Sequence, residues 1–242
     1  MDKIVLKLQR LGLEIEDLNN ISPDLIQELF LDLSVVEISK LCRLNTKFNS
    51  VCLRESLWNS KVWIDYGIEK KYGDTWRETA KNLSQLNMIN LNETWVNRKT
   101  YKEIMDESMD TKENSFTHVT NLLQTEFEAA IGVGIMDKFH MSLFNEEELK
   151  TYGKSRLGRN LRSGELDKLR LIFTREFHVI VKTLQIYGAY FPNLPGIGLA
   201  FASRLRSRPI PRRNRNLRSS HPIVMKFFDI NLYIMDFSSE IQ

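Results

Sequence analysis

Helix start signals, each followed by apolar residues at helical spacing, are the feature that most restricts the fold of this 242-residue chain. Ser22 stands before Pro23 and Asp24, as expected of an N-cap followed by the first turn of a helix. Ser34 and Glu37 have the spacing of a capping box. Beyond each signal, Leu, Ile and Val recur every three or four residues. The sequence therefore predicts a mainly α-helical protein.

The same reasoning gives an expected order of elements. We expect helices over residues 4–18, 23–33, 34–44, 47–53, 56–66, 75–83, 93–105, 119–139, from 145 onward and over 163–187. Gly67 and Gly188 are expected to end two of these helices. Residues 106–115 are acidic and polar, as in a linker. Alternating apolar residues within 222–237 predict a short terminal β-strand or hairpin.

The chain length allows one large domain or two small ones. We expect an N-terminal amphipathic helix, a compact helical module, a helical extension and a helical C-terminal domain, over residues 1–20, 21–66, 67–110 and 111–242.

Composition excludes several classes of protein. Hydrophobic residues make up 42% of the chain and charged residues 27%, unlike a disordered chain. No apolar run reaches the roughly 20 residues that a membrane span needs. The two cysteines, Cys42 and Cys52, lie in apolar sequence, so we expect small buried hydrophobic side chains rather than a disulfide.

No set of residues matches a catalytic or metal-binding pattern. Gly153-Lys154-Ser155 ends like a phosphate-binding loop, but the required earlier glycine is Glu148. The four histidines are widely separated and lack cysteine or histidine neighbours at ligand spacing. We therefore expect a protein that is not an enzyme and that uses no cofactor or metal.

Positive charge is concentrated near the C-terminus, where residues 150–242 carry a net charge of +11. The densest part holds seven arginines, namely Arg204, Arg206, Arg208, Arg212, Arg213, Arg215 and Arg218. Such a segment can bind phosphates of nucleic acid or an acidic protein surface, or it can be a solvated basic loop. The sequence leaves these three interpretations open.

Residues 21–66 resemble an F-box. The resemblance rests on the run Ile21 to Phe30 and on Leu33, Ile38, Leu41-Cys42, Leu44-Asn45, Phe48, Val51-Cys52 and Leu57-Trp58. Short F-box-like proteins of large DNA viruses share phrases similar to Leu41-Cys42-Arg43-Leu44-Asn45, Phe48-Asn49-Ser50-Val51-Cys52 and Asp65-Tyr66-Gly67.

The resemblance implies a three-helix module that docks on the adaptor subunit of a cullin-based ubiquitin ligase, while the C-terminal half recruits an unknown target protein. The candidate docking residues are Pro23, Leu25, Ile26, Leu29, Leu33, Ile38 and Trp58. We assign Leu41, Cys42, Phe48, Val51 and Cys52 to the internal core. The expected location is the cytoplasm or nucleus of an infected host cell, or the virion. As an alternative, the protein is a structural component of a viral particle or nucleoprotein assembly that uses its basic C-terminal region.

Overall fold

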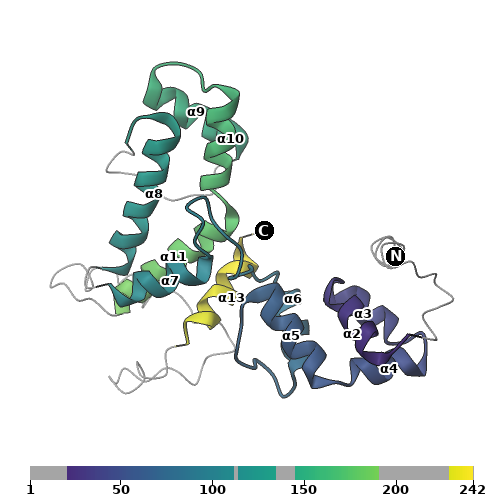
Figure 1. Cartoon of the computed structure of the whole chain (residues 1–242). Helices are drawn as coiled ribbons and strands as arrows, with labels where there is room; N and C mark the ends of the chain where they lie inside the picture. The colour runs from purple at the N-terminus through teal and green to yellow at the C-terminus, as the bar shows by residue number, and fades with distance from the viewer. Residues whose placement is uncertain (1–20, 112–113, 135–144, 191–228, 242) are drawn as a thin grey trace. The chain divides into compact units, whose positions relative to one another are not determined.

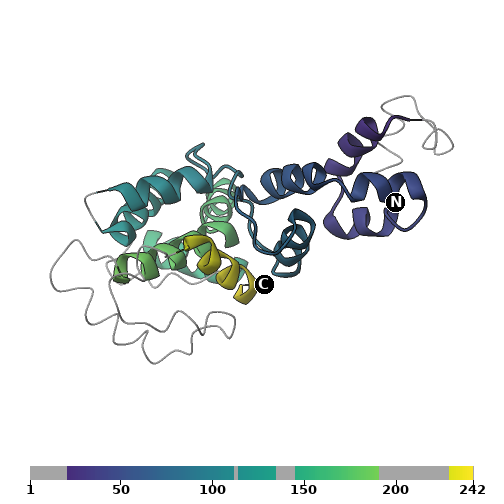
Figure 2. The same ribbon diagram turned by 90° about the horizontal axis from the view of Figure 1, so that it is seen from below.

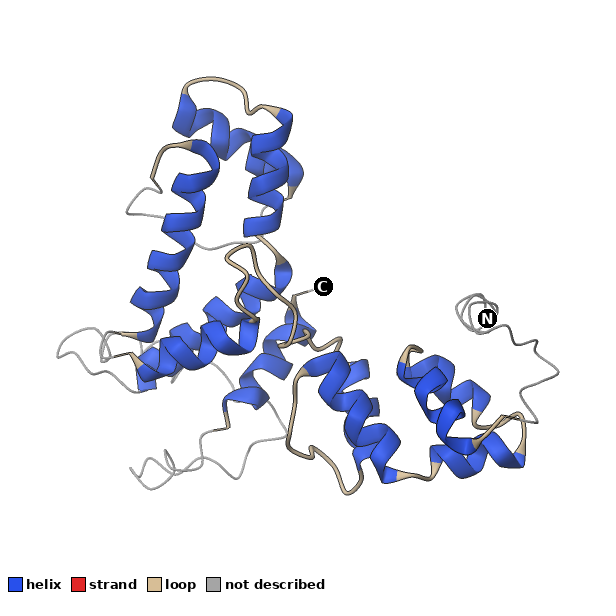
Figure 3. Ribbon diagram, in the orientation of Figure 1, coloured by secondary structure: helices blue, strands red, loops and turns tan. Residues whose placement is uncertain are grey.

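The computed structural model describes residues 21–111, 114–134, 145–190 and 229–241. Eleven helices and no strand occur in these residues, which confirms the prediction of a mainly helical protein (Figure 1, Figure 3). The chain divides into two compact units, residues 1–88 (unit 1) and residues 89–242 (unit 2). The helix expected over residues 4–18 lies outside the described residues.

Unit 1 starts with three short helices, α2 (Pro23–Leu31), α3 (Val35–Leu41) and α4 (Thr46–Cys52). Their starts follow the predicted signals. The Ser22 hydroxyl accepts a hydrogen bond from the Leu25 amide at 3.2 Å, and Ser34 forms the expected capping box with Glu37. Asn45 caps α4, because its side-chain oxygen accepts from the Phe48 amide at 2.7 Å.

Two longer helices complete unit 1, α5 (Glu55–Tyr66) and α6 (Trp76–Gln85). Gly67 ends α5 in the left-handed conformation with φ of 68°, as the sequence predicts. The Thr75 hydroxyl caps α6 by accepting from the Glu78 amide at 3.0 Å. Helix α5 packs against α2, α4 and α6, so it is the central helix of this unit.

Unit 2 contains α7 (Tyr101–Asp110), α8 (Ser115–Ile131), α9 (Glu146–Leu157), α10 (Ser163–Ile172), α11 (Arg175–Tyr190) and α13 (Ile230–Glu240). Helix α11 contacts α7, α8 and α13 and is the centre of the unit (Figure 2). The Trp95 and Phe177 rings stack here, with their centroids 4.0 Å apart, and the Trp95 indole Nε1 donates to the Ile172 carbonyl at 3.1 Å.

The predicted terminal strand is wrong over residues 230–237, which form α13, whereas residues 222–228 lie outside the described residues. The alternating apolar residues also contain helical spacing, because Ile230, Ile234 and Phe237 are four and three residues apart. In the structure Ile234 and Phe237 are buried, and the Asp229 carboxylate caps the helix by accepting from the Asn231 amide at 3.2 Å.

The single helix expected over residues 163–187 is instead two helices, because the helical conformation is interrupted at Phe173 and Thr174. The Thr174 hydroxyl accepts from the Phe177 amide at 3.2 Å and thereby starts α11. Gly188 lies inside α11 and does not stop it. A Cβ atom at Gly188 would lie only 3.0 Å from the side-chain oxygen of Asn114, so this glycine permits close packing.

The helix expected over 93–105 begins later, at Tyr101, and includes residues 106–110 of the expected linker. A tight turn precedes it, in which the Trp95 amide donates to the Lys99 carbonyl at 2.8 Å and Arg98 has φ of 67°. Helix α8 ends at Gly132, with φ of 77°, rather than at residue 139. These differences arise because a local hydrogen-bonded turn or a left-handed glycine overrides continued apolar spacing.

Candidate functional site

Five of the seven candidate docking residues are buried in unit 1, namely Ile26, Leu29, Leu33, Ile38 and Trp58. Their side chains fill the core between the helices, so they do not form an exposed surface in this structure. Pro23 and Leu25 are partly exposed. The apolar stripe that predicts a helix face cannot by itself distinguish a face that packs internally from one that binds a partner.

The residues assigned to the internal core are mostly buried as expected. Cys42, Phe48, Val51 and Cys52 are buried, whereas Leu41 is partly exposed. The Phe48 ring meets the ring of Phe30 edge-on at a centroid distance of 5.8 Å.

Most of the large exposed apolar side chains among the described residues belong to unit 1. Among the described residues, the exposed large hydrophobic side chains are Val36, Leu44, Leu53, Trp63, Ile64 and, in unit 2, Leu171. Leu44 and Leu53 are the most exposed of these, each at 69%. Sequence reasoning did not single out either one as a docking residue. A signal was available, because both are the last residue of a short expected helix, where no further turn of that helix covers an apolar side chain.

An ion pair places Leu25 and Leu53 at the same end of unit 1. The Asp24 carboxylate lies 2.7 Å from the Arg54 guanidinium, joining the start of α2 to the end of α4. Leu25 follows Asp24 in the chain and Leu53 precedes Arg54. We call Leu25, Leu44 and Leu53 together the leucine surface, of which Leu25 and Leu53 lie near the end of α4 and Leu44 lies just before its start.

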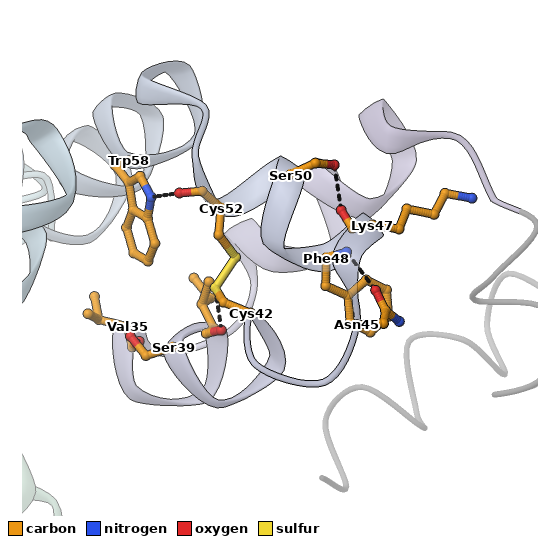
Figure 4. The surroundings of a disulfide bond; sticks show 10 residues. Val35, Ser39, Cys42, Asn45, Lys47, Phe48, Ser50, Cys52 and Trp58 are labelled. Atoms are coloured by element: carbon orange, nitrogen blue, oxygen red, sulfur yellow. Dashed lines mark hydrogen bonds between the residues drawn. A yellow bond between two sulfur atoms is a disulfide. The ribbon is translucent and has the colours of Figure 1, made fainter.

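The two cysteines form a disulfide, contrary to the prediction of free thiols (Figure 4). Their Cα atoms are 6.0 Å apart, and both side chains are buried. The sequence separation of ten residues does not predict how far apart the two Cα atoms lie. The turn between α3 and α4 brings them within the range that a disulfide needs. The Trp58 indole Nε1 donates to the Cys52 carbonyl at 2.7 Å, which fixes the end of α4 against α5.

Lys61 is an almost fully buried lysine that joins α5 to α2. Its ammonium group donates to the Leu31 carbonyl at 2.8 Å and to the Asp65 carboxylate at 2.8 Å. Burial raises the pKa of the Asp65 carboxyl, and the Lys61 charge opposes that shift. The sequence contains no pattern that identifies this lysine as buried.

A depression of about 340 Å³ lies on unit 1, lined by Asn59, Ser60, Trp63, Ile68, Glu69 and Trp76. Glu69 is the only charged residue among these lining residues. A lone carboxylate beside two indoles matches no acid–base pair or metal-ligand set.

The remaining candidate residues do not add to a site in the described structure. The seven arginines of segment 204–218 lie outside the described residues. Within residues 21–111, 114–134, 145–190 and 229–241, no group of three His, Cys, Asp or Glu side chains could hold a metal ion. His178 is buried in unit 2, and burial lowers its pKa to about 4.

None of the described helices combines the length and the apolar character needed to cross a membrane. Comparisons of the sequence with protein-family models and with curated proteins, and of the fold with solved structures, found no match. The candidate site is therefore described from this structure alone: one partly exposed and two exposed leucines on a small helical unit that also contains a buried disulfide.

Proposed function

We propose that this protein is an F-box-type interaction adaptor, in which unit 1 docks on the adaptor subunit of a cullin-based ubiquitin ligase and the remainder of the chain recruits a target. The observation that supports this function is the leucine surface, which lies inside the segment that resembles an F-box. Of the large exposed hydrophobic side chains among the described residues, all except Leu171 lie in unit 1.

The exposed leucines supply a physical reason for docking. Full burial of one leucine side chain contributes about 1.5–3 kcal/mol relative to exposure. Leu44 and Leu53 are each 69% exposed, so a partner groove that covers both gains several kcal/mol at most, before the cost of association is subtracted. Affinity of useful strength therefore requires further contacts around them, which the partly exposed Pro23 and Leu25 can supply.

The test is capture of purified recombinant ligase adaptor by the full-length protein carrying Leu44→Asp and Leu53→Asp. We expect capture to fall at least about tenfold, because binding would have to bury two aspartate carboxylates in a groove that accepts apolar leucine side chains. The matched control is Leu171→Asp, because Leu171 is 61% exposed but belongs to unit 2. This control should bind like the natural sequence.

A change at Leu29 would not serve the same purpose, because that side chain is buried and a carboxylate there would unfold unit 1. Thermal melting of each variant confirms that the unit remains folded. If the folded Leu44→Asp and Leu53→Asp variant binds adaptor as well as the control does, the docking function assigned to the leucine surface is wrong.

A further inference from the structure

The depression on unit 1 contains two tryptophans and one acidic side chain in the same lining. It is formed by α5, the start of α6 and the connection between them, and its lining includes Trp63, Glu69 and Trp76. Trp63 is 40% exposed, Glu69 is exposed and Trp76 is partly exposed. A ligand that enters the depression can therefore contact both indoles and the carboxylate.

Local features of the sequence determine which side chains line the depression. Asn59 and Ser60 precede Trp63 by four and three residues in α5, so the three side chains share one face of that helix. Gly67 then ends α5 in the left-handed conformation. The chain turns at this glycine, and Glu69, two residues later, lines the same depression.

Hydrogen bonds hold the connection between α5 and α6 in place. The Tyr72 amide donates to the Thr79 hydroxyl at 2.9 Å, and the Asn82 side-chain amide donates to the Tyr72 carbonyl at 2.9 Å. The Trp76 amide donates to the Glu55 carboxylate at 3.0 Å, which joins the start of α6 to α5. The depression is therefore formed before a ligand arrives, so binding requires little ordering of the chain.

The lining favours a positively charged ligand. Tryptophan attracts cations more strongly than the other aromatic residues do. Glu69 adds a negative charge, and none of the described residues that line the depression is a lysine, arginine or histidine. The two lysines that follow Glu69 have other contacts: the Lys70 ammonium lies 5.7 Å from the centre of the Tyr72 ring, and the Lys71 ammonium lies 4.0 Å from the Glu55 carboxylate. An acidic ligand would meet a negative charge here with no cation in the lining to offset it.

Among cations, an arginine side chain fits this lining best. Its planar guanidinium stacks on aromatic rings, pairs with a carboxylate through two hydrogen bonds and carries five donors. The acceptors in the lining are the Glu69 carboxylate, the Asn59 side-chain oxygen and the Ser60 hydroxyl. A quaternary ammonium has no donor for these oxygens, and a lysine ammonium is more strongly hydrated than a guanidinium. The volume of about 340 Å³ is at the lower end of the range for ligand sites, as suits a single side chain.

We infer that this depression is a recognition site for an arginine side chain of a partner protein, which contacts the indoles of Trp63 and Trp76 and pairs with Glu69. The inference goes beyond the adaptor function and does not depend on it, because none of the lining residues belongs to the leucine surface.

The first test titrates full-length, isotope-labelled protein with an acetylated glycine–serine peptide that carries one arginine, and follows the four indole N–H signals by nuclear magnetic resonance. We expect the signals of Trp63 and Trp76 to shift with a dissociation constant on the order of 1 mM, because a single side chain supplies the contacts. The signals of Trp58 and Trp95 should not move, because both rings are buried. A citrulline peptide, which carries a neutral urea in place of the guanidinium, should bind at least about tenfold more weakly.

Substitutions in the lining provide the second test. Trp63→Ala and Glu69→Gln should each weaken binding of the arginine peptide at least about fivefold. The matched controls are Ile64→Ala, at an exposed apolar side chain of α5, and Asp74→Asn, at an exposed carboxylate of the same connection; neither residue lines the depression. Each control should change the affinity less than about twofold. Thermal melting confirms that every variant is folded.

Three results would overturn the inference. Equal affinity for the arginine and citrulline peptides would show that the depression does not select a cation. Unshifted signals of Trp63 and Trp76 at about 10 mM arginine peptide would show that the side chain does not enter. Replacement of the seven arginines of segment 204–218 by serine tests the chain's own segment as the occupant, and peptide affinity that rises about tenfold or more would assign the site to that segment instead of a partner.

The same titration separates this site from the docking function. The Leu44→Asp and Leu53→Asp variant should bind the arginine peptide as the natural sequence does. Loss of adaptor capture with retained peptide binding is the expected result for that variant. If the natural sequence captures no adaptor but binds the peptide, the adaptor function fails and the arginine site stands.

Discussion

At the scale of single residues, unit 1 depends on a few side chains whose role is not visible in the sequence pattern. Lys61 has the strongest such role, because its buried ammonium group satisfies both the Leu31 carbonyl and the Asp65 carboxylate. A buried charge is tolerated only when hydrogen bonds and an opposite charge offset the cost of removing it from water. Removing one partner of a buried ion pair leaves the other charge buried and unpaired, which destabilises the fold.

Lys61→Met should lower the free energy of unfolding of unit 1 by about 3 kcal/mol at neutral pH, because the Asp65 carboxylate is left partly buried without its cation. The double change Lys61→Met and Asp65→Asn should recover part of this loss. Denaturant unfolding measures both values. The matched control is Lys99→Met, which breaks an exposed ion pair with Glu107 at 2.6 Å and should cost less than about 1 kcal/mol. Equal losses at Lys61 and Lys99 would contradict the buried role.

The cysteines illustrate what sequence can and cannot supply at this scale. Burial of Cys42 and Cys52 follows from their apolar neighbours and is confirmed. Their pairing depends on how the turn between α3 and α4 returns the chain, which no local pattern encodes. Leu29 and Trp58 show the same limit of sequence patterns. Helical periodicity identifies an apolar face, but it does not distinguish a face that packs within the unit from one that binds a partner.

At the scale of helices, start signals are predictable and helix ends are less so. The caps at Ser22, Ser34, Thr75 and Asn145 are all present, because each is a contact between residues three apart in the chain. The break at Thr174 and the helical form of residues 230–240 involve distant residues as well as local caps, because the Tyr101 hydroxyl lies 2.9 Å from the Thr174 hydroxyl and α13 packs against α11. Capping signals therefore predict where helices begin better than apolar periodicity predicts where they stop.

Arg175 shows how a distant contact stabilises an element that the sequence does not reveal. Its guanidinium Nε donates to the Ile241 carbonyl at 2.6 Å and its Nη2 donates to the Ser238 carbonyl at 2.7 Å. These carbonyls lie at the C-terminal end of α13, where backbone acceptors have no partner within the helix and a positive charge is favourable.

Arg175→Lys should lower the free energy of unfolding of unit 2 by about 1–2 kcal/mol, because one ammonium group cannot reproduce the two-pronged guanidinium contact. Amide exchange in α13 should increase while exchange in α9 stays unchanged. Arg170→Lys is the control, since Arg170 is exposed and its two ion pairs, with Asp167 at 3.0 Å in its own helix and with Glu146 at the start of α9, both involve exposed carboxylates. A loss no larger than that of the control would show that Arg175 does not anchor α13.

At the scale of the whole molecule, we expect the stability of unit 1 to depend on reductant and the stability of unit 2 to depend on pH. The disulfide belongs to unit 1 and the buried His178 to unit 2. Burial, with a smaller effect of the Lys182 charge, lowers the His178 pKa from 6.5 to about 4. Because the folded-state pKa is depressed, the unfolded state takes up the proton first, and the stability of unit 2 is lost as pH falls from 6.5 toward 4.

Scanning calorimetry should therefore resolve two transitions that respond to different conditions. Dithiothreitol should lower the melting temperature of unit 1 alone. A shift from pH 7 to pH 4 should reduce the stability of unit 2 by up to about 3 kcal/mol through His178, and His178→Leu should remove that part of the pH dependence. A single transition that moves under both conditions would contradict the independence of the units.

The pairing of Ile89 with α13 has a consequence for the order in which the protein is made. The Ile89 amide donates to the Ser238 hydroxyl at 3.3 Å, across 149 residues of chain. Every described contact within unit 1 joins residues before position 89, so that unit is complete while the ribosome is still adding unit 2. Unit 2 instead waits for its final helix, and until α13 arrives the face of α11 that it covers is open to chaperones and to neighbouring nascent chains.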